Sequence, residues 1–443
     1  MSWLSIFRSR RDTTGLAERT FDTIRASPRS DGDSALPRFK AMANDSDRGS
    51  LGLAGTAEQP RPRLQRAFTP SQPIRDLHMF AGRKDLLLSL IRATEEDQMH
   101  AVIFGDRGMG KTSLLNMLGA LAREARYIVH YSSCSESSTF DTIFRAVCQN
   151  IPLLYHADID PTSEKAERDG RLSELLPPGE LSVALLTEAF AKLSGTRVLV
   201  LIDEFDRAQS VELRRSIVGL IKALSDRSIR VQIILAGVAG NLAGLFEHIP
   251  SIRRNLVGIA VTPMSEAEVL ELIRNGESRS GLIFTKAAVD CIVDVALGSP
   301  YIAGLICQQS ASLTIHRKSP TVEISDVSGA LRRAVDDARI RIAPTGQQQV
   351  DALSAEAPLS ELTDFARLSL TSYGFISDDE NCRTERRNLI SSALKIGAIE
   401  PVTLGNRKGY RFVDESVPFL LWLDAQRSRT AVPSQIGTNS RSA

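Results

Sequence analysis

The chain has 443 residues, of which 42% are hydrophobic and 24% are charged. These values are ordinary for a globular protein of two or three domains, and they exclude collagen-like, coiled-coil and wholly disordered chains. The 54 lysines and arginines nearly cancel the 53 aspartates and glutamates, so the net charge of +1 gives no overall field for holding a polyanion. A nucleic-acid site, if the protein has one, must be local.

The cysteines and the apolar runs indicate in which cellular compartment the protein is expected. The five cysteines are widely spread and form no C-x-x-C pair, which argues against a disulfide framework and against a zinc site. No stretch reaches the roughly 18 uninterrupted apolar residues of a membrane span. The first eleven residues also lack the order of charges that is typical of a secretory signal. We therefore expect a cytoplasmic protein with reduced thiols.

Residues 1–72 are rich in Ser, Arg, Asp, Gly and Pro and show no sustained periodicity, which predicts a mostly disordered arm. This arm carries twelve Lys and Arg against eight Asp and Glu, so it is basic, with a net charge of +4. Two interpretations stay open. The arm is a solvated tail, or its apolar residues 3–7 and the following arginines form a tip that touches a membrane or a partner.

From about residue 73, short apolar runs alternate with helical patterns such as that of residues 111–125. Five runs have the length and composition of buried strands: 101–104, 127–131, 198–202, 231–235 and 258–261. Because strands separated by helices pair in parallel, we expect an α/β core over 73–263 with helices on both faces of the sheet. The polar stretch 156–180 predicts an exposed insert.

The strongest chemical signal is the sequence Gly-Asp-Arg-Gly-Met-Gly-Lys-Thr at 105–112, which fits G-x-x-x-x-G-K-[S/T] between the first strand and its helix. The glycines let backbone N–H groups face a phosphate, and the helix N-terminus adds the positive end of its dipole. In such a P-loop, Lys111 reaches the β- and γ-phosphates and Thr112 ligates Mg²⁺. The predicted nucleotide-binding residues are Gly105, Asp106, Arg107, Gly108, Met109, Gly110, Lys111, Thr112 and Ser113.

A second signal lies 91 residues after Thr112, where the apolar strand 198–202 ends in Asp203 and Glu204. Ligands of open α/β sheets bind at the carboxyl ends of the strands, so Asp203 is predicted to hold the Mg²⁺ ion. Glu204 is predicted to polarise the attacking water as general base. Without a P-loop, the pair would be only a solvated strand end. Together, the two motifs predict Mg²⁺-dependent hydrolysis of a nucleoside triphosphate.

With these motifs, residues 74–315 resemble P-loop ATPases of the AAA+ and STAND type, and among them the origin-recognition-like ATPase domains of bacteria and archaea. The resemblance implies ATP as the nucleotide and a P-loop NTPase sheet with a helical lid. Residues 80–83, Phe-Ala-Gly-Arg, look like the segment that helps to enclose adenine in these proteins, which implies that Phe80 and Arg83 bind the cofactor. Alternatively, these two residues belong to an ordinary loop that leads into the next helix.

The same resemblance implies two further catalytic residues. Asn241 lies close to the place of the polar residue that senses the γ-phosphate, although Gly240 matches that place better; Asn241 is otherwise a helix cap. Arg254, with Arg253 as the second choice, lies where relatives have an arginine that reaches the nucleotide of a neighbouring subunit. A guanidinium supplied in trans makes hydrolysis depend on assembly. The alternative is a surface arginine paired with a local acid.

Residues 264–318 are expected to form the lid, and Ser265 with Glu268 makes a capping-box pattern at its start. At the place of Tyr301, many relatives have a second arginine that senses the nucleotide. The tyrosine argues against a contact between a lid arginine and ATP. The sequence Gly-Ser-Pro at 298–300 resembles the STAND branch instead. Members of that branch act as slow nucleotide switches.

A helical connector is predicted over 319–344, a winged-helix-like α+β domain over 345–425 and a disordered tail over 426–443. Helical segments at 361–373 and 384–396 precede a hairpin formed by 399–402 and 410–413. Residues 383–411 carry seven basic and two acidic residues. Phosphate contacts to DNA are predicted from Arg383, Arg386, Arg387, Lys395, Arg407 and Lys408.

Two functions remain open. The first is an ATP-driven switch whose nucleotide state controls assembly with itself or with a protein partner, the winged helix then being a packing module. The second is an ATP-regulated DNA-binding factor similar to initiators or transposition helpers. A small-molecule kinase is a weaker third possibility, because the tandem acids at 203–204 suit activation of water.

Overall fold

The computed structural model describes Leu64 and residues 67–160, 162, 168, 170–238, 254–372, 374–378, 384–404 and 407–431. Most of the predicted arm lies outside these residues, as do Asn241, Arg253 and Arg383. The side chain of Arg407 also lies outside the described part. The predictions made for these residues are therefore not addressed by the structure.

A five-stranded parallel sheet has the strand order β2-β3-β4-β1-β5. Its strands are β1 His100–Gly105, β2 Ile128–Ser133, β3 Val198–Asp203, β4 Val231–Val238 and β5 Leu256–Ala260. All five predicted strands are present, with ends that differ from the prediction by no more than three residues. The P-loop NTPase sheet expected from the sequence is therefore the fold of this part of the chain.

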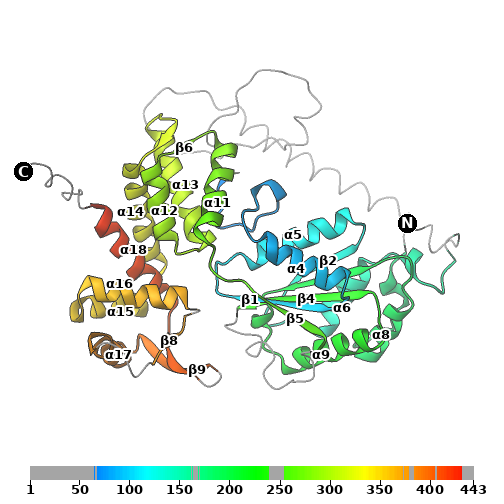
Figure 1. Cartoon of the computed structure of the whole chain (residues 1–443). Helices are drawn as coiled ribbons and strands as arrows, with labels where there is room; N and C mark the ends of the chain where they lie inside the picture. The colour runs from blue at the N-terminus through cyan, green and yellow to red at the C-terminus, as the bar shows by residue number, and fades with distance from the viewer. Residues whose placement is uncertain are drawn as a thin grey trace, which may run out of the picture. The chain divides into compact units, whose positions relative to one another are not determined.

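Helices cover both faces of the sheet, and β3 shows why. Every residue of β3 is buried, and successive side chains point to opposite faces. Val200 lies in one hydrophobic cluster with residues of the helices on one face, and Leu201 in another with those on the opposite face. Figure 1 shows α4 and α5 on one side of the sheet and α8 and α9 on the other. These helices are α4 Lys84–Glu95, α5 Lys111–Glu124, α6 Phe140–Gln149, α8 Val183–Ala191 and α9 Val211–Asp226.

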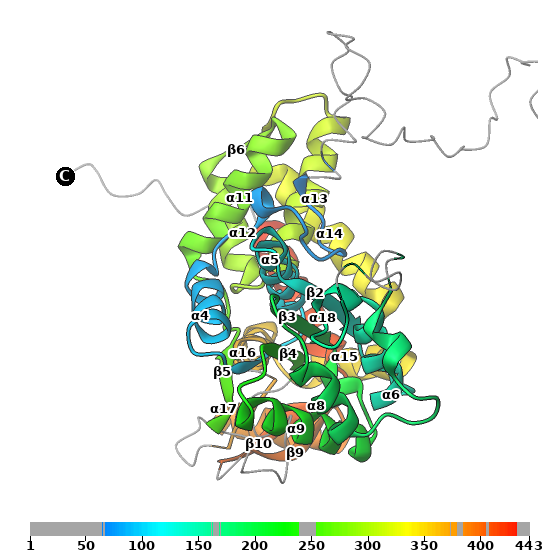
Figure 2. The same cartoon turned by 90° about the vertical axis from the view of Figure 1, so that its right-hand side faces the viewer.

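A helical lid and the predicted connector follow the sheet, and Figures 1 and 2 both show their helices side by side. They are α11 Glu266–Ser280, α12 Lys286–Ala296, α13 Pro300–His316 and α14 Ile324–Arg341. The short parallel strands β6 Ile283–Phe284 and β7 Thr321–Val322 tie two of their loops together. The predicted capping box is present: the Ser265 hydroxyl accepts from the N–H of Glu268, whose carboxylate accepts from the N–H of Ser265.

The C-terminal segment, residues 344–431, contains helices and a three-stranded antiparallel sheet of order β8-β10-β9. Its elements are α15 Pro344–Glu356, α16 Leu359–Thr371, β8 Ile376–Ser377, α17 Thr384–Ile396, β9 Ile399–Leu404, β10 Arg407–Phe412 and α18 Ser416–Ala431. The predicted helices and hairpin correspond to α16, α17, β9 and β10. The core residues of this segment and of the lid form one continuous hydrophobic cluster.

Three boundaries differ from the prediction. The predicted arm ends earlier than residue 72, because Leu64 and Phe68 are buried in the core of the lid, and the Phe68 ring lies where a Cβ on Gly276 would be. The tail begins later than residue 426, because α18 continues to Ala431 and Gln426 is buried. The insert is not exposed throughout, since Leu172 lies fully buried against α6. In each case, apolar contact made by residues distant in the sequence overrides local polarity.

Of the helices that the structure describes, none is long and apolar enough to cross a membrane. Four of the five cysteines are described, and all four are free thiols, as predicted: Cys134, Cys148, Cys291 and Cys307.

Candidate nucleotide-binding site

The predicted P-loop connects the carboxyl end of β1 to the N-terminus of α5. Three of its residues are glycines with positive φ, at 152° for Gly105, 79° for Gly108 and 88° for Gly110. A Cβ on Gly105 would lie 2.5 Å from the carbonyl oxygen of Val261, so this position also lacks room for a side chain. The sequence therefore places glycine where the backbone must curl in a way that other residues resist.

Lys111 is the first residue of α5, and its side chain is buried against the loop. Its ammonium donates to the carbonyl oxygens of Gly105 at 2.9 Å and Asp106 at 2.7 Å. Burial lowers the pKa of Lys111, and the negative charges around it, Asp206 foremost, act in the opposite direction. A partly desolvated ammonium over a glycine loop is a strong site for a phosphate oxygen.

Thr112 and Ser113 follow in the first turn of α5, and both line the same pocket as Lys111. The Ser113 hydroxyl accepts a 3.1 Å hydrogen bond from the N–H of Ile74. The segment before α4 is thereby held across the start of α5. Residues 67–76 form one wall of the pocket, which the sequence analysis did not predict.

Asp203 ends β3, and its side chain is buried. One carboxylate oxygen accepts from the N–H of Glu204 at 2.8 Å, and the other from the Tyr131 hydroxyl at 2.9 Å. Since β4 lies between β3 and β1, and neighbouring strands lie about 4.8 Å apart, Asp203 is about 10 Å from the end of β1. That gap suits a phosphate group with a cation.

Glu204 has a left-handed backbone with φ of 51°, which turns its side chain out of the strand line. The carboxylate accepts from the Ser133 hydroxyl at 3.0 Å and forms an ion pair with Arg207 at 3.1 Å. Tyr131 and Ser133 both belong to β2, which pairs with β3 with Ser133 opposite Asp203. Sequence reasoning missed Tyr131 and Ser133, because the pairing of β2 with β3 is not visible in either strand alone.

Lys111, Thr112, Ser113, Asp203 and Glu204 line one pocket of about 1100 Å³. It contains the P-loop residues Arg107, Gly108, Gly110 and Lys111, the two acids at the end of β3, and residues from the lid and the C-terminal segment. Its charged side chains are Arg75, Asp76, Arg107, Lys111, Asp203, Glu204, Asp206, Arg207, Arg279 and Glu415. The two motifs that the sequence placed 91 residues apart thus meet in a single cavity of ligand size.

The lid closes over the P-loop at the N-terminus of α13. Pro300 and Tyr301 line the pocket, and a Cβ added to Gly108 would lie 3.3 Å from the Cβ of Tyr301. The Ser299 hydroxyl caps α13 by accepting from the N–H of Ile302. The residue at the place of the lid arginine is therefore in contact range of the loop, but it is a tyrosine.

Residues 80–83, which were predicted to help enclose adenine, are hydrogen-bonded to the lid and do not line the pocket. The Phe80 ring packs, half-buried, beside the cluster around Leu90 and is not among the residues that line the cavity. Arg83 is buried; its guanidinium donates to the carbonyl of Met109 at 3.4 Å, and its N–H to Glu268 at 2.8 Å. Arg83 therefore lies next to the P-loop, and neither residue lines the cavity.

Arg254 is exposed and lies two residues before β5. Because β5 runs parallel to β1 with Leu256 opposite His100, Arg254 lies near the amino end of the sheet. The P-loop follows the other end of β1, about 20 Å away for six residues of strand. Arg254 therefore cannot reach a phosphate bound on the P-loop of its own chain.

The predicted DNA-contacting residues lie on α17 and β10. Arg387 and Lys395 on α17 and Lys408 on β10 are exposed, whereas Arg386 is half-buried. None of these four residues lines the pocket of the P-loop.

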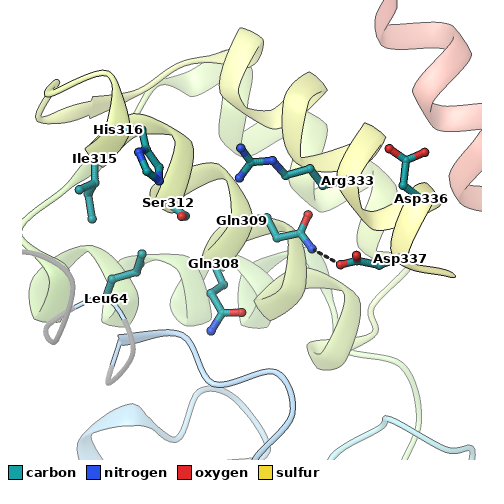
Figure 3. Close-up of a pocket in the computed structure, with 9 residues that line it drawn as sticks. All are labelled: Leu64, Gln308, Gln309, Ser312, Ile315, His316, Arg333, Asp336 and Asp337. Atoms are coloured by element: carbon teal, nitrogen blue, oxygen red, sulfur yellow. Dashed lines mark hydrogen bonds between the residues drawn. The ribbon is translucent and has the colours of Figure 1, made fainter. Parts of the chain in front are cut away.

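A second cavity, of about 660 Å³, lies between α13 and α14. Figure 3 shows the Gln309 amide directed at the Asp337 carboxylate, with which it makes a 3.3 Å hydrogen bond. One arginine, Arg333, and two aspartates are the charged residues of its lining, and no glycine loop borders it. It therefore has no feature that would select a nucleotide.

One family match agrees with this geometry. Residues 93–246 match the family described as AAA domain, and no curated protein sequence matches the chain. The chain is similar to Cdc6p of Pyrobaculum aerophilum, at 14% identity and a TM-score of 0.45, over 83% of this chain and 98% of that one. The chain is also similar to the ORC1 protein of Aeropyrum pernix in complex with DNA, at 15% identity and a TM-score of 0.43. This similarity covers 84% of this chain and 100% of that one.

A third similar structure is the RuvB Holliday junction branch migration motor of Thermotoga maritima, at 15% identity and a TM-score of 0.42, over 78% of this chain and 97% of that one. Likenesses this distant concern the fold alone and assign no partner or substrate. The family match covers β1, the P-loop, β2, β3 and β4. The chain therefore carries an AAA-type P-loop ATPase domain at residues 93–246.

Proposed function

We propose that this protein binds ATP with Mg²⁺ in the pocket of the P-loop and hydrolyses it slowly, as a molecular switch. The observation that carries the proposal is the meeting of Lys111, Thr112, Asp203 and Glu204 in one cavity of about 1100 Å³. The glycine loop offers N–H groups to phosphates, and Lys111 adds a fixed positive charge. The match to the AAA domain supports ATP as the nucleotide.

The donor set fits Mg²⁺. Asp203 and the Thr112 hydroxyl are oxygen ligands on two sides of the cavity, and Asp203 is oriented by two hydrogen bonds. Among the described residues, no group of three or more His, Cys, Asp or Glu side chains is placed to hold a metal by itself. That pattern suits an ion whose remaining ligands are phosphate oxygens and water. When bound, the ion neutralises charge on the phosphates.

Glu204 is the candidate base. Its carboxylate lines the cavity next to Asp203 and is almost half exposed, so a water molecule has access to it. Ser133 and Arg207 orient it by hydrogen bonds to the same oxygen, Oε2. In this proposal, Glu204 takes the proton of the attacking water, and Lys111 stabilises the charge that develops on the phosphoryl oxygens.

The switch is proposed to control assembly with a second copy of the chain or with a protein partner. Arg254 supports the first case, because it is exposed and about 20 Å from its own P-loop, so only another chain's nucleotide is within its reach. An arginine supplied in trans would make turnover depend on assembly. Asn241 remains a second proposed contributor from the sequence.

A second candidate function is DNA binding by the C-terminal segment. We infer a winged-helix-like domain from its order of helices and strands, and the exposed Arg387, Lys395 and Lys408 are suited to phosphate contacts. A salt-dependent affinity for duplex DNA that falls on Arg387→Ala replacement would support this function. Binding that is absent at low salt would leave the segment as a packing module.

The primary test measures nucleotide affinity and phosphate release. Lys111→Ala should weaken ATP binding by at least tenfold, whereas Glu204→Gln should bind ATP normally and release phosphate at least a hundredfold more slowly. Lys222→Ala and Glu212→Gln, which change exposed residues of α9, are the matched controls. If the Glu204→Gln protein released phosphate as fast as the parent, the proposed base would be wrong.

A further inference from the structure

The C-terminal helix α18 is anchored in the lid. The indole of Trp422 is buried, and its Nε1–H donates a 2.9 Å hydrogen bond to the carbonyl of Val295 in the last turn of α12. The ring of Phe419 lies 6.3 Å, centroid to centroid, from that of Tyr301, which lines the nucleotide pocket. The position of the start of α18 is therefore fixed relative to the pocket.

Glu415 immediately precedes α18 and lines the nucleotide pocket together with Lys111. It is the one residue of segment 344–431 among the residues that line this pocket. Lys111 is also the residue whose ammonium serves the terminal phosphates in a P-loop. A carboxylate that lines the same pocket as Lys111 therefore repels a γ-phosphate held there.

The charges that line the pocket are balanced, with five acids and five bases. Two of the acids already form ion pairs, Asp76 with Arg279 at 2.8 Å and Glu204 with Arg207 at 3.1 Å. Asp203 has the proposed role of a Mg²⁺ ligand, so Asp206 and Glu415 are the carboxylates left to oppose a phosphate. Asp206 is tied to β4, since it accepts from the N–H of Val238 at 2.8 Å. Glu415 comes from a separate part of the chain.

We propose that Glu415 is a specificity-determining residue that favours a nucleoside diphosphate over a triphosphate in the P-loop pocket. This inference rests on the proposed function. The third phosphate adds negative charge near Lys111, and repulsion by the Glu415 carboxylate opposes it. Because Glu415 is fixed to the lid through α18, binding of a triphosphate and movement of the lid, together with the C-terminal segment, away from the P-loop favour each other.

The test compares affinities for ADP and for the β,γ-imido analogue of ATP, measured by calorimetry on the full chain with Mg²⁺. Glu415→Gln and Glu415→Ala should both tighten binding of the analogue relative to ADP, by roughly fivefold at low salt. The effect should shrink in 0.5 M salt, at a Debye length of roughly 4 Å. Glu356→Gln, which changes an exposed acid at the end of α15, should leave the ratio unchanged.

An unchanged ratio in both Glu415 variants would overturn the inference while leaving the proposed function in place. A change in the Ala variant alone would also overturn it, because it would assign the effect to side-chain bulk and not to charge. If the parent bound neither nucleotide, and its calorimetric titration matched that of Lys111→Ala, both the proposed function and this inference would be wrong.

Discussion

The hydroxyl of Tyr131 donates a 2.9 Å hydrogen bond to Oδ2 of Asp203, joining the ends of β2 and β3 at the floor of the nucleotide pocket. Burial, and secondly the charge of Asp203, raises the pKa of Tyr131, so the phenol stays protonated at neutral pH and keeps donating. The bond leaves Asp203 one preferred orientation. It makes Tyr131 a positioning residue for the proposed Mg²⁺ ligand.

Replacing Tyr131 by Phe should therefore weaken the apparent affinity for Mg²⁺ by about fivefold, since a hydrogen bond to a charged group is worth about 1.5–3 kcal/mol and water replaces part of it. Nucleotide binding without Mg²⁺ should not change. The measurement is a Mg²⁺ titration of phosphate release. Tyr127→Phe is the control, because that hydroxyl bonds to Arg197 instead. Identical titrations for the two variants would remove the proposed role of Tyr131.

Gly108 should not tolerate alanine. Its φ of 79° costs an L-residue about 1–2 kcal/mol, and the added Cβ would meet the Cβ of Tyr301 at 3.3 Å. We expect Gly108→Ala to weaken nucleotide binding by at least tenfold. Gly179→Ala is the control, because its φ is 103° but nothing lies within 4 Å of the added Cβ.

The two glycine variants should both lose stability but should differ in nucleotide affinity. Backbone strain alone lowers the free energy of unfolding in both, whereas nucleotide affinity should fall only for Gly108→Ala. Equal affinities for the two variants, measured by calorimetry, would mean that the space above Gly108 does not matter for binding.

Local patterns in the sequence were sufficient to predict the P-loop and the acids at 203–204, because the chemistry of each motif is contained in a few adjacent residues. The five strands could also be predicted from local patterns, because buried parallel strands are continuous apolar runs. Partners that come together through strand pairing were not predictable. Ser133 reaches Glu204 only because β2 pairs with β3, and sequence periodicity does not give strand order.

The C-terminal end of the fold was the least predictable part. Helix α18 contains Pro418 in its first turn, where proline is tolerated because no intrahelical N–H bond is lost there. That proline and the preceding hairpin hide the helical pattern of its buried residues. Glu415 lies 304 residues after Lys111, so only tertiary packing places it in the pocket.

Trp422 should contribute measurably to stability. Its indole N–H satisfies a carbonyl in the last turn of α12, which has no partner within the helix. Trp422→Phe would leave that buried carbonyl unpaired, at a cost of about 1–3 kcal/mol in the free energy of unfolding. Urea unfolding followed by circular dichroism measures it. Val413→Ala, at an exposed position just before α18, is the control and should leave the midpoint unchanged.

His100 predicts how stability depends on pH. It is fully buried at the start of β1, where its Nδ1 accepts a 2.9 Å hydrogen bond from the N–H of Ile233, and burial lowers its pKa from 6.5 to about 4. The unfolded chain therefore binds the proton more readily than the folded one between these values. Stability should fall as the pH drops from 6.5 to 4, by roughly 3 kcal/mol from this residue.

Replacement of His100 by Asn tests this assignment, because the amide oxygen accepts the same backbone N–H but does not titrate. The free energy of unfolding, measured by urea titration at several pH values, should depend less on pH in the variant than in the parent. Some dependence should remain, since burial also lowers the pKa of His130 and of His156. His316→Asn changes an exposed histidine and is the control. If the His100 variant kept the full slope between pH 4 and 6.5, the acid sensitivity would have to arise from the carboxylates, whose protonation acts in the same direction.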